Sequence, residues 1–393
     1  MPSNDRHPTP PRDVLTRLVF DHFPTDTIDH AFAYGSAVFS QPGLYPTSTN
    51  HHMLDLLFTV QGTVAGLARM LALTHSHARP DSLAHSLSRS CYALIDPVAW
   101  HRHNLARNPH HYAFPMSYLG PEAIHWASGH IGCGVYFNPM VKLRDKDTTR
   151  LVKYGVAATD VVERDLLDWN SLYVAGRLHK AVETLIEDQR IASAQEANLS
   201  SALRTALFLL GSHRGTNAIF PIHTLMHTIV SLSYTGDIRV GIAEDSNKAD
   251  RIVDGSGDQL LDMYAPALTR EVDRGSIQLV DIGRRGRSGR SGKYDGISRD
   301  SHVQITTVDP SGLLESLPAA LRRRVHADVC LDASSARHAA RAALASALAA
   351  TVRRSSARQA ALGLLSAGPT RAARYLLEKL KKTSFLPASH VNR

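Results

Sequence analysis

The stretch HAFAYGSAVFSQ, residues 30–41, decides how the rest of the chain is interpreted. Apolar residues fill positions 31–34 as in a short strand, and Gly35-Ser36 interrupt them before Ala37 resumes the apolar run. A strand that ends in Gly-Ser before a helix can hold a phosphate, because glycine lets the backbone come close and helix N-terminal amides attract anions. Gly-Ser is equally common in ordinary turns, so this stretch alone leaves both interpretations open.

The next strand signal carries a single acid. MLDLLFTV, residues 53–60, is apolar except for Asp55. A carboxylate on such a strand is costly unless it is paired with Lys or Arg or binds a metal. A Gly-Ser turn, a loop and then an acid on the following strand resemble the layout of the nucleotidyltransferase fold, in which strand carboxylates hold the Mg²⁺ ions that clamp the reacting phosphates.

The composition limits the class of protein. The chain has 393 residues, 43% hydrophobic and 20% charged, which predicts two or three globular domains and excludes a disordered chain. Its net charge of +8 suits nucleic acid, nucleotides or an anionic membrane, although solubility alone explains it equally well. Three widely spaced cysteines favour a reducing compartment, and we expect no transmembrane helix. The N-terminus is only a weak match to a mitochondrial presequence because acids interrupt it.

Sequence texture predicts an α/β fold in four parts. A mixed sheet with helices would occupy residues 21–185, and a mainly helical second domain, for which a winged-helix-like form is one option, would follow. The expected parts are a loose N-terminus at 1–20, a nucleotidyltransferase domain at 21–185, a second domain at 186–310 and a basic helical region at 311–393. Within the first domain we expect a helix that begins after Asp96-Pro97 and ends near Asn108-Pro109, two strands joined by RDKDT, and a helix over 161–178.

Several long strings resemble one family in the same order. They are FAYGSAVFSQ, MLDLLFTV, DPVAWHRHNLARNPHHYAF, LVKYGV, DLLDWNSLYVAGRLHK, LSYTGDIRVGIAED and SSARQAALGLLSAG. The chain thereby resembles the mitochondrial translocator assembly and maintenance family, from about residue 20 to about residue 370. The resemblance implies a CTP-dependent phosphatidate cytidylyltransferase that feeds cardiolipin synthesis. It also implies Mg²⁺ as cofactor and a peripheral location on the matrix side of the mitochondrial inner membrane.

The resemblance also implies roles for individual residues. Gly35 and Ser36 would take the CTP phosphates, and Asp55 would be a catalytic metal ligand. Lys153, in LVKYGV, would be catalytic and contact phosphate, with Tyr154 beside it in the nucleotide site. A lysine whose stem packs on the surface while its amine reaches water is the alternative for Lys153.

Two further groups are candidates for the cleft. WHRHNLARNPHHY contains the first group, for which substrate contact and packing are both open: His101, Asn104, His111 and Tyr112. Zinc is disfavoured there because no cysteine or acid completes a usual ligand set. YTGDIRVGIAEDSNK supplies the second group, which could serve CTP or a second metal, or form an interdomain salt-bridge cluster: Asp237, Arg239, Glu244 and Asp245.

The chain departs from the family pattern at three points. The neighbours of Asp55 on its strand face are Met53 and Leu57, so a second metal ligand must come from elsewhere, with Asp96, Asp168, Asp237, Glu244 and Asp245 as candidates. Leu362 stands where the family tends to have a lysine, and Arg353, Arg354 or Arg358 could replace it. Residues 61–94 have an odd composition and are interpreted as a surface insert or an unspliced intron.

The C-terminal region is strongly basic. TRAARYLLEKLKKTSFL predicts an amphipathic helix that lies on an anionic membrane through Arg371, Arg374, Lys379, Lys381 and Lys382. A solvated helix is the alternative. CTP, phosphatidic acid and an anionic membrane are therefore the expected partners, nucleic acid is not, and the oligomeric state stays open. Two rival functions are a nucleotidyltransferase acting on RNA and a non-catalytic assembly factor for mitochondrial protein import.

Overall fold

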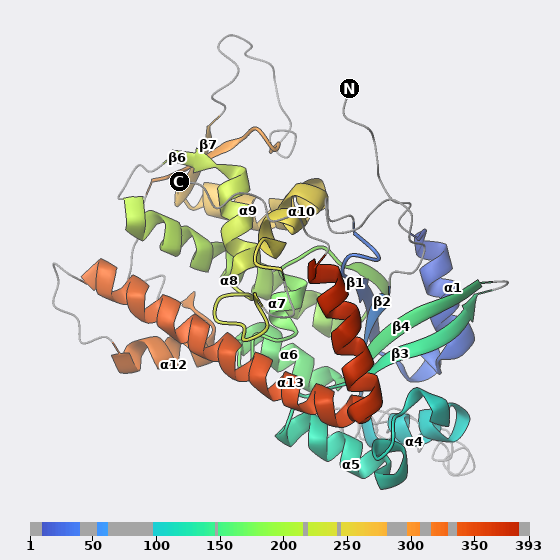
Figure 1. Cartoon of the computed structure of the whole chain (residues 1–393). Helices are drawn as coiled ribbons and strands as arrows, with labels where there is room; N and C mark the ends of the chain where they lie inside the picture. The colour runs from blue at the N-terminus through green and yellow to red at the C-terminus, as the bar shows by residue number, and fades with distance from the viewer. Residues whose placement is uncertain are drawn as a thin grey trace, which may run out of the picture.

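The computed structural model of the chain is a mixed α/β structure (Figure 1). It describes residues 10–39, 53–61, 97–145, 148–214, 219–241, 245–280, 297–306, 316–328 and 336–384. No helix in these ranges is long and apolar enough to cross a membrane. The mixed sheet with helices confirms the predicted fold class.

A five-stranded sheet in the order β3-β4-β2-β1-β5 forms the first layer. Its strands are β1 (His30–Tyr34), β2 (Leu54–Val60), β3 (Val135–Asp145), β4 (Thr148–Ala158) and β5 (Glu183–Ile186). The β2–β4 pair is parallel and the other pairs are antiparallel. The two expected strands around RDKDT are therefore confirmed as the hairpin β3–β4. The central strand β2 carries Asp55, and its neighbour β4 carries Lys153.

The alternation of side chains divides this sheet into two faces. Leu56, Phe58 and Tyr154 point to one face, where helices α1 (Arg12–His22) and α4 (Pro97–Arg107) cover them. Phe32 and Leu57 point to the opposite face, beneath helix α6 (Thr159–Asp168) and the helices that follow it. The side chains of two residues that are adjacent in sequence, such as Leu56 and Leu57, therefore lie on opposite faces of the sheet.

Helices and a small sheet make up the second layer. The helices are α7 (Ala175–Leu178), α8 (Gln189–Arg214), α9 (Ile222–Ser231) and α10 (Lys248–Asp273). The strands β6 (Ile219–Pro221), β7 (Ile277–Val280) and β8 (His302–Ile305) form a sheet in the order β6-β8-β7. Helices beside a small antiparallel sheet agree with the mainly helical second domain that the sequence predicts. The domain boundaries and the winged-helix-like form stay predictions.

A long C-terminal helix connects the layers. Figure 1 shows α13 (Ala336–Ser384) running from α12 (Ala319–Asp328) to α5 (Met116–His130). Gln359 fixes it there, because its amide nitrogen donates to the Val135 carbonyl at 3.1 Å and its oxygen accepts from the Cys133 N–H at 3.1 Å. Gly368, with φ 67°, breaks the helix near its end and redirects the last segment.

Two local expectations need correction. The predicted helix over 161–178 ends at Trp169, which takes a left-handed conformation, and Leu172 is also left-handed before the short helix α7 begins. The 3.6-residue apolar period was present, but the Asp165 carboxylate holds a loop there instead. In addition, Gly35-Ser36 open a turn over residues 35–39 and not a regular helix. The helix expected to end near Asn108-Pro109 is confirmed as α4, which runs from Pro97, where the described stretch begins, to Arg107.

Candidate functional site

Asp55 and Lys153 lie side by side at the centre of the five-stranded sheet. They are register partners on the parallel strands β2 and β4, so their side chains point to the same face. The Lys153 Nζ lies 3.7 Å from the Asp55 Oδ1, and the two side chains are 17% and 24% exposed. The amine also lies 4.4 Å from the centre of the Phe137 ring. Because the ion pair is long and partly open, both groups remain accessible to a ligand.

Gly35 completes this corner from strand β1. Its neighbour Tyr34 is the register partner of Asp55, which brings the Gly35 turn directly to the carboxylate. Gly35 has φ +84°, and a Cβ at this position would lie 3.2 Å from the Asp55 Oδ2. The turn is closed by N–H groups of Val38 and Phe39, which donate to the Gly35 carbonyl at 3.0 and 2.9 Å. Only glycine satisfies both the left-handed backbone and the close approach.

Arg177 is a member of this site that the sequence analysis did not select. Its Nη1 donates to the Tyr173 carbonyl at 2.6 Å, and its Cζ lies 3.8 Å from the centre of the Tyr173 ring. The rings of Tyr34 and Phe137 follow at 5.7 and 5.9 Å. We call the group of Gly35, Asp55, Lys153 and Arg177 the Asp55 corner. A basic residue inside the apolar run LYVAGRLH was a signal of the same kind as Asp55 on its strand.

The loop that leads into α7, the helix that carries Arg177, is held by one buried carboxylate. Asp165 accepts hydrogen bonds from the N–H groups of Ser171, Leu172, Val174 and Ala175 at 2.8 to 3.2 Å. This explains why the chain leaves the helix after α6 and returns as α7. The loop therefore places Arg177 with little freedom.

Two buried polar groups, Tyr34 and Arg177, lie next to each other beside Asp55. The Tyr34 hydroxyl and the Arg177 Nε are buried and have no hydrogen-bond partner among the described residues. Burial and the negative charge of Asp55 raise the pKa of Tyr34, so its hydroxyl stays protonated and can donate. Lys153 beside Asp55, and the neighbouring pair of Tyr34 and Arg177, form a site that suits an anion with a bound cation, such as a polyphosphate with its metal.

The residues of the corner fit a Mg²⁺ ion. No group of three His, Cys, Asp or Glu that could hold a metal occurs within the described ranges, and Asp55 is the carboxylate present at the corner. Mg²⁺ is commonly held by one or two carboxylates, with substrate phosphates and water completing the octahedron. The partly exposed Asp55 carboxylate, beside a site that suits phosphate, is therefore a suitable donor for Mg²⁺. The role of Asp55 as a metal ligand and the identity of a second ligand stay predictions.

The candidates from WHRHNLARNPHHY and Tyr154 form a buried network on the opposite face of the sheet. The Asn104 Nδ2 donates to the hydroxyls of Tyr112 and Tyr154 at 3.0 and 2.8 Å. His101 Nδ1 lies 2.9 Å from the Tyr112 hydroxyl, and His111 Nδ1 lies 3.0 Å from that of Tyr154. All five are at most 3% exposed, and burial lowers the pKa of His101 to about 3. Their geometry favours packing that supports the sheet from behind, the second of the two expected roles.

The candidates after α9 are engaged in local ion pairs. Arg239 contacts Asp237 with both Nε and Nη2, at 3.0 and 2.6 Å, and its charge is close enough to act on Arg177. Asp245 pairs with the Arg251 Nε at 2.6 Å at the start of α10. Glu244 lies outside the described residues, as do Asp96 and nearly all of the 61–94 block. The structure thus brings Arg239 toward the corner and engages Asp237 and Asp245 in ion pairs.

The C-terminal candidates have two different environments. Leu362 is fully buried beside Gly132, while Arg358 donates to the carbonyls of Gly129, His130 and Ile131 at the end of α5. Leu362 is therefore part of the core here, and Arg358 fixes α13 to α5. Arg371, Arg374, Lys379, Lys381 and Lys382 lie in the last segment of α13, where the backbone alone is described.

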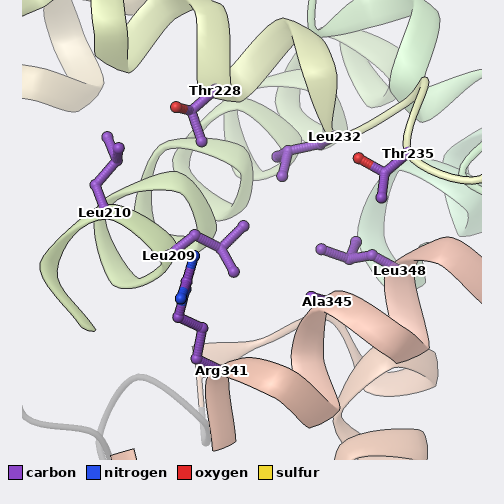
Figure 2. Close-up of a pocket in the computed structure, with 8 residues that line it drawn as sticks. All are labelled: Leu209, Leu210, Thr228, Leu232, Thr235, Arg341, Ala345 and Leu348. Atoms are coloured by element: carbon purple, nitrogen blue, oxygen red, sulfur yellow. The ribbon is translucent and has the colours of Figure 1, made fainter. Parts of the chain in front are cut away.

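A separate apolar pocket of about 320 Å³ lies between α8, α9 and α13 (Figure 2). Its lining residues are Leu209, Leu210, Thr228, Leu232, Thr235, Arg341, Ala345 and Leu348. The hydroxyls of Thr228 and Thr235 donate to helix carbonyls, and Arg341 is the charged residue of an otherwise mostly apolar lining. This pocket shares no residue with the Asp55 corner and is a poor match for a triphosphate.

Comparisons with known proteins identify the family. The family model described as "Phosphatidate cytidylyltransferase, mitochondrial" matches residues 16–77 and 90–382, and the unmatched stretch falls within the predicted insert. The protein of that name from Mus musculus is 32% identical over 378 residues, which covers 94% of each chain. The one from Xenopus laevis is 31% identical over 93% of each chain, and the human one is 30% identical over 90% of this chain and 67% of its own.

Proposed function

Since the chain belongs to the mitochondrial phosphatidate cytidylyltransferase family, we propose that it joins CTP to phosphatidic acid to form CDP-diacylglycerol and pyrophosphate. The observation that carries the proposal is the Asp55–Lys153 pair beside the Gly35 turn, at the centre of a sheet in a chain that matches the family over nearly its full length.

The proposed reaction depends more on the position of charged groups around the phosphates than on proton transfer by the protein. A phosphate oxygen of phosphatidic acid attacks the α-phosphorus of CTP, and the bond to the bridging oxygen of the β-phosphate breaks, so pyrophosphate leaves with the electron pair. The attacking group is already an anion at neutral pH, so no strong general base is required. The protein must bring two anions together and stabilise negative charge in the transition state.

The Asp55 corner offers groups for each of these tasks. Lys153 and Arg177 provide two cations on one side of the sheet, and the Arg177 guanidinium suits a two-point contact with phosphate oxygens. The Gly35 turn lets backbone approach the triphosphate, with Ser36 as a further donor. Tyr154, assigned to the nucleotide by resemblance, would act from behind the sheet by fixing β4 and hence Lys153.

We propose Mg²⁺ as the cofactor, held by Asp55 and by the substrate phosphates. When bound, it would neutralise charge on the reacting phosphates. Lys153, whose amine makes only a long contact of 3.7 Å with Asp55, would bind the phosphate oxygens.

The relatives are named as mitochondrial proteins, which supports a mitochondrial location for this chain. We place it on the matrix side of the inner membrane, as a peripheral protein that supplies CDP-diacylglycerol for cardiolipin. Its lipid substrate requires contact with a membrane, and the five basic residues of 371–382 against one acid suit an anionic surface.

Labelled CTP tests the proposed function against its rivals. Purified chain is incubated with labelled CTP, Mg²⁺ and phosphatidic acid vesicles, and in parallel with RNA, beside Asp55→Ala. We expect labelled CDP-diacylglycerol from the natural chain and none from the variant. Label transferred to RNA would instead support the RNA nucleotidyltransferase. No product from either protein would support the non-catalytic import factor.

A further inference from the structure

Helix α5 turns large apolar side chains outward. Phe114, just before the helix, is 74% exposed, and Tyr118, Leu119 and Trp126 are 81%, 53% and 55% exposed. Gly120, with φ +85°, kinks α5 into two segments, and each segment also buries a side chain in the core: Met116 before the kink and Ile124 after it. Single exposed apolar residues are common on soluble proteins. Several large ones on one element indicate a surface that binds a membrane or another molecule.

The outward side of α5 continues onto the end of α13. Leu364 and Leu365 are 66% and 37% exposed, one turn before the break at Gly368. A Cβ at Gly368 would lie 2.9 Å from the Phe114 carbonyl oxygen, so the break lies against the start of α5. We call the six residues the aromatic face: Phe114, Tyr118, Leu119, Trp126, Leu364 and Leu365. The last segment of α13 therefore begins at this face.

The charge around the aromatic face identifies what would cover it. Residues 97–130 contain one acid, Glu122, and it is already paired with Arg102 at 2.5 Å. The segment that begins beyond Gly368 carries five basic residues and one acid between 371 and 382. Tyr and Trp prefer the boundary between lipid tails and headgroups, and basic segments prefer anionic headgroups. Both features match an anionic bilayer more closely than an acidic or neutral protein.

We propose that the aromatic face is the membrane-docking surface of the protein, with Trp126 in the headgroup layer of an anionic bilayer. The docking proposal rests on the proposed function, because a lipid substrate would require the protein to bind a membrane. The docking itself needs no CTP and no phosphatidic acid. The basic last segment of α13 would then lie along the same bilayer and add electrostatic attraction.

The natural tryptophans allow a direct test. The chain has three, and Trp100 and Trp169 are at most 1% exposed, so a change in emission on docking reports Trp126. The full chain is mixed with vesicles of phosphatidylcholine and phosphatidylglycerol, without nucleotide, and then with vesicles that carry brominated acyl chains. We expect a blue shift of the emission and quenching by bromine, both weaker with phosphatidylcholine alone. Unchanged emission and no quenching would overturn the proposal.

Matched variants connect docking to the aromatic face. Phe114→Ser with Tyr118→Ser should weaken vesicle binding about tenfold or more, because apolar area is lost from the lipid phase. Phe20→Ser is the control, since Phe20 is 54% exposed on the distant helix α1. Equal loss in both variants would overturn the proposal. So would a concentration-dependent dimer whose Trp126 emission is already blue-shifted without vesicles, because the face would then be an interface between copies.

Turnover separates this inference from the proposed function. The double variant should lose turnover on vesicles and keep it on dispersed short-chain phosphatidic acid. If the natural chain docks but makes no product from either substrate, the proposed function fails and the docking surface stands. If it makes product from both but Trp126 never enters the bilayer, the docking surface fails alone.

Discussion

At the scale of single residues, the Asp55 corner combines partly buried charged groups, which a bound ligand would stabilise, with a glycine that leaves space beside them. The carboxylate on an apolar strand and the buried Arg177 Nε each cost free energy on folding, while Gly35 takes its left-handed conformation without strain and leaves room beside Asp55. Their meeting at one point is the strongest local argument for a functional site.

Gly35→Ala tests the requirement for glycine. The left-handed conformation costs an alanine about 1–2 kcal/mol, and the new methyl group would also press on Asp55. We expect a large loss of CTP turnover together with this modest loss of stability. Gly275→Ala is the control, because Gly275 has φ +71° but nothing within 4 Å of a Cβ. Equal turnover losses in the two variants would contradict a specific role for Gly35.

Lys153→Met should lower kcat/KM for CTP by about 100-fold, since removal of one preorganised charge partner commonly costs that much. Lys142→Met, on the exposed side of the neighbouring strand β3, should leave it unchanged. Steady-state kinetics with varied CTP measures both. If the Lys153→Met variant has the same kcat/KM for CTP as the natural chain, Lys153 does not contact phosphate and is instead a lysine whose stem packs on the surface.

Arg177→Lys keeps the charge but loses the planar two-point geometry, so we expect a turnover loss of about tenfold or more with little change in melting temperature. Arg164→Lys, on the exposed side of α6, serves as the control and should behave like the natural chain. Full activity in Arg177→Lys would remove Arg177 from the phosphate site.

At the scale of elements, the loop between α6 and α7 does the positioning. Its conformation depends on Asp165, which is 5% exposed and accepts several backbone hydrogen bonds. Asp165→Ala should therefore cost about 3–5 kcal/mol, because buried donors lose their partner. Asp160→Ala, which removes an exposed ion pair on the same helix, should cost less than about 1 kcal/mol. Urea unfolding of both variants measures the difference, and equal costs would contradict the account.

The sequence predicted elements whose pattern is local and missed what depends on distant contacts. Strands β2, β3 and β4 could be predicted because apolar runs mark them and the polar turn RDKDT separates β3 from β4. The loop after Trp169 was not, because its apolar spacing is helical and the Asp165 carboxylate overrides it. Likewise, the sequence predicted that Lys153 lies on a strand, but its position beside Asp55 follows only from the parallel register of β2 and β4. The side of the sheet that Tyr154 and Asn104 occupy also needed the three-dimensional structure.

At the scale of the whole molecule, buried histidines couple stability to pH. Burial lowers the pKa of His30 to about 4 and those of His101 and His179 to about 3, from the 6.5 expected in the unfolded chain. Below pH 6.5 the unfolded chain binds more protons, so stability is full above 6.5 and falls as the pH drops toward these values. Each histidine contributes up to about 1.4 kcal/mol per pH unit.

Urea midpoints between pH 7.5 and pH 5 check this expectation. The free energy of unfolding should fall steadily below pH 6.5, and His101→Gln should show a shallower slope. A flat profile over this window would contradict neutral buried histidines.

The central claim is that the triphosphate of CTP binds at the Asp55 corner, and a crystal structure of the chain with CTP and Mg²⁺ tests it most directly. We predict phosphate oxygens within hydrogen-bonding distance of the Lys153 Nζ, the Arg177 guanidinium and the turn at Gly35, with the metal on Asp55. A triphosphate bound elsewhere, with the Asp55 corner occupied by water alone, would contradict the account.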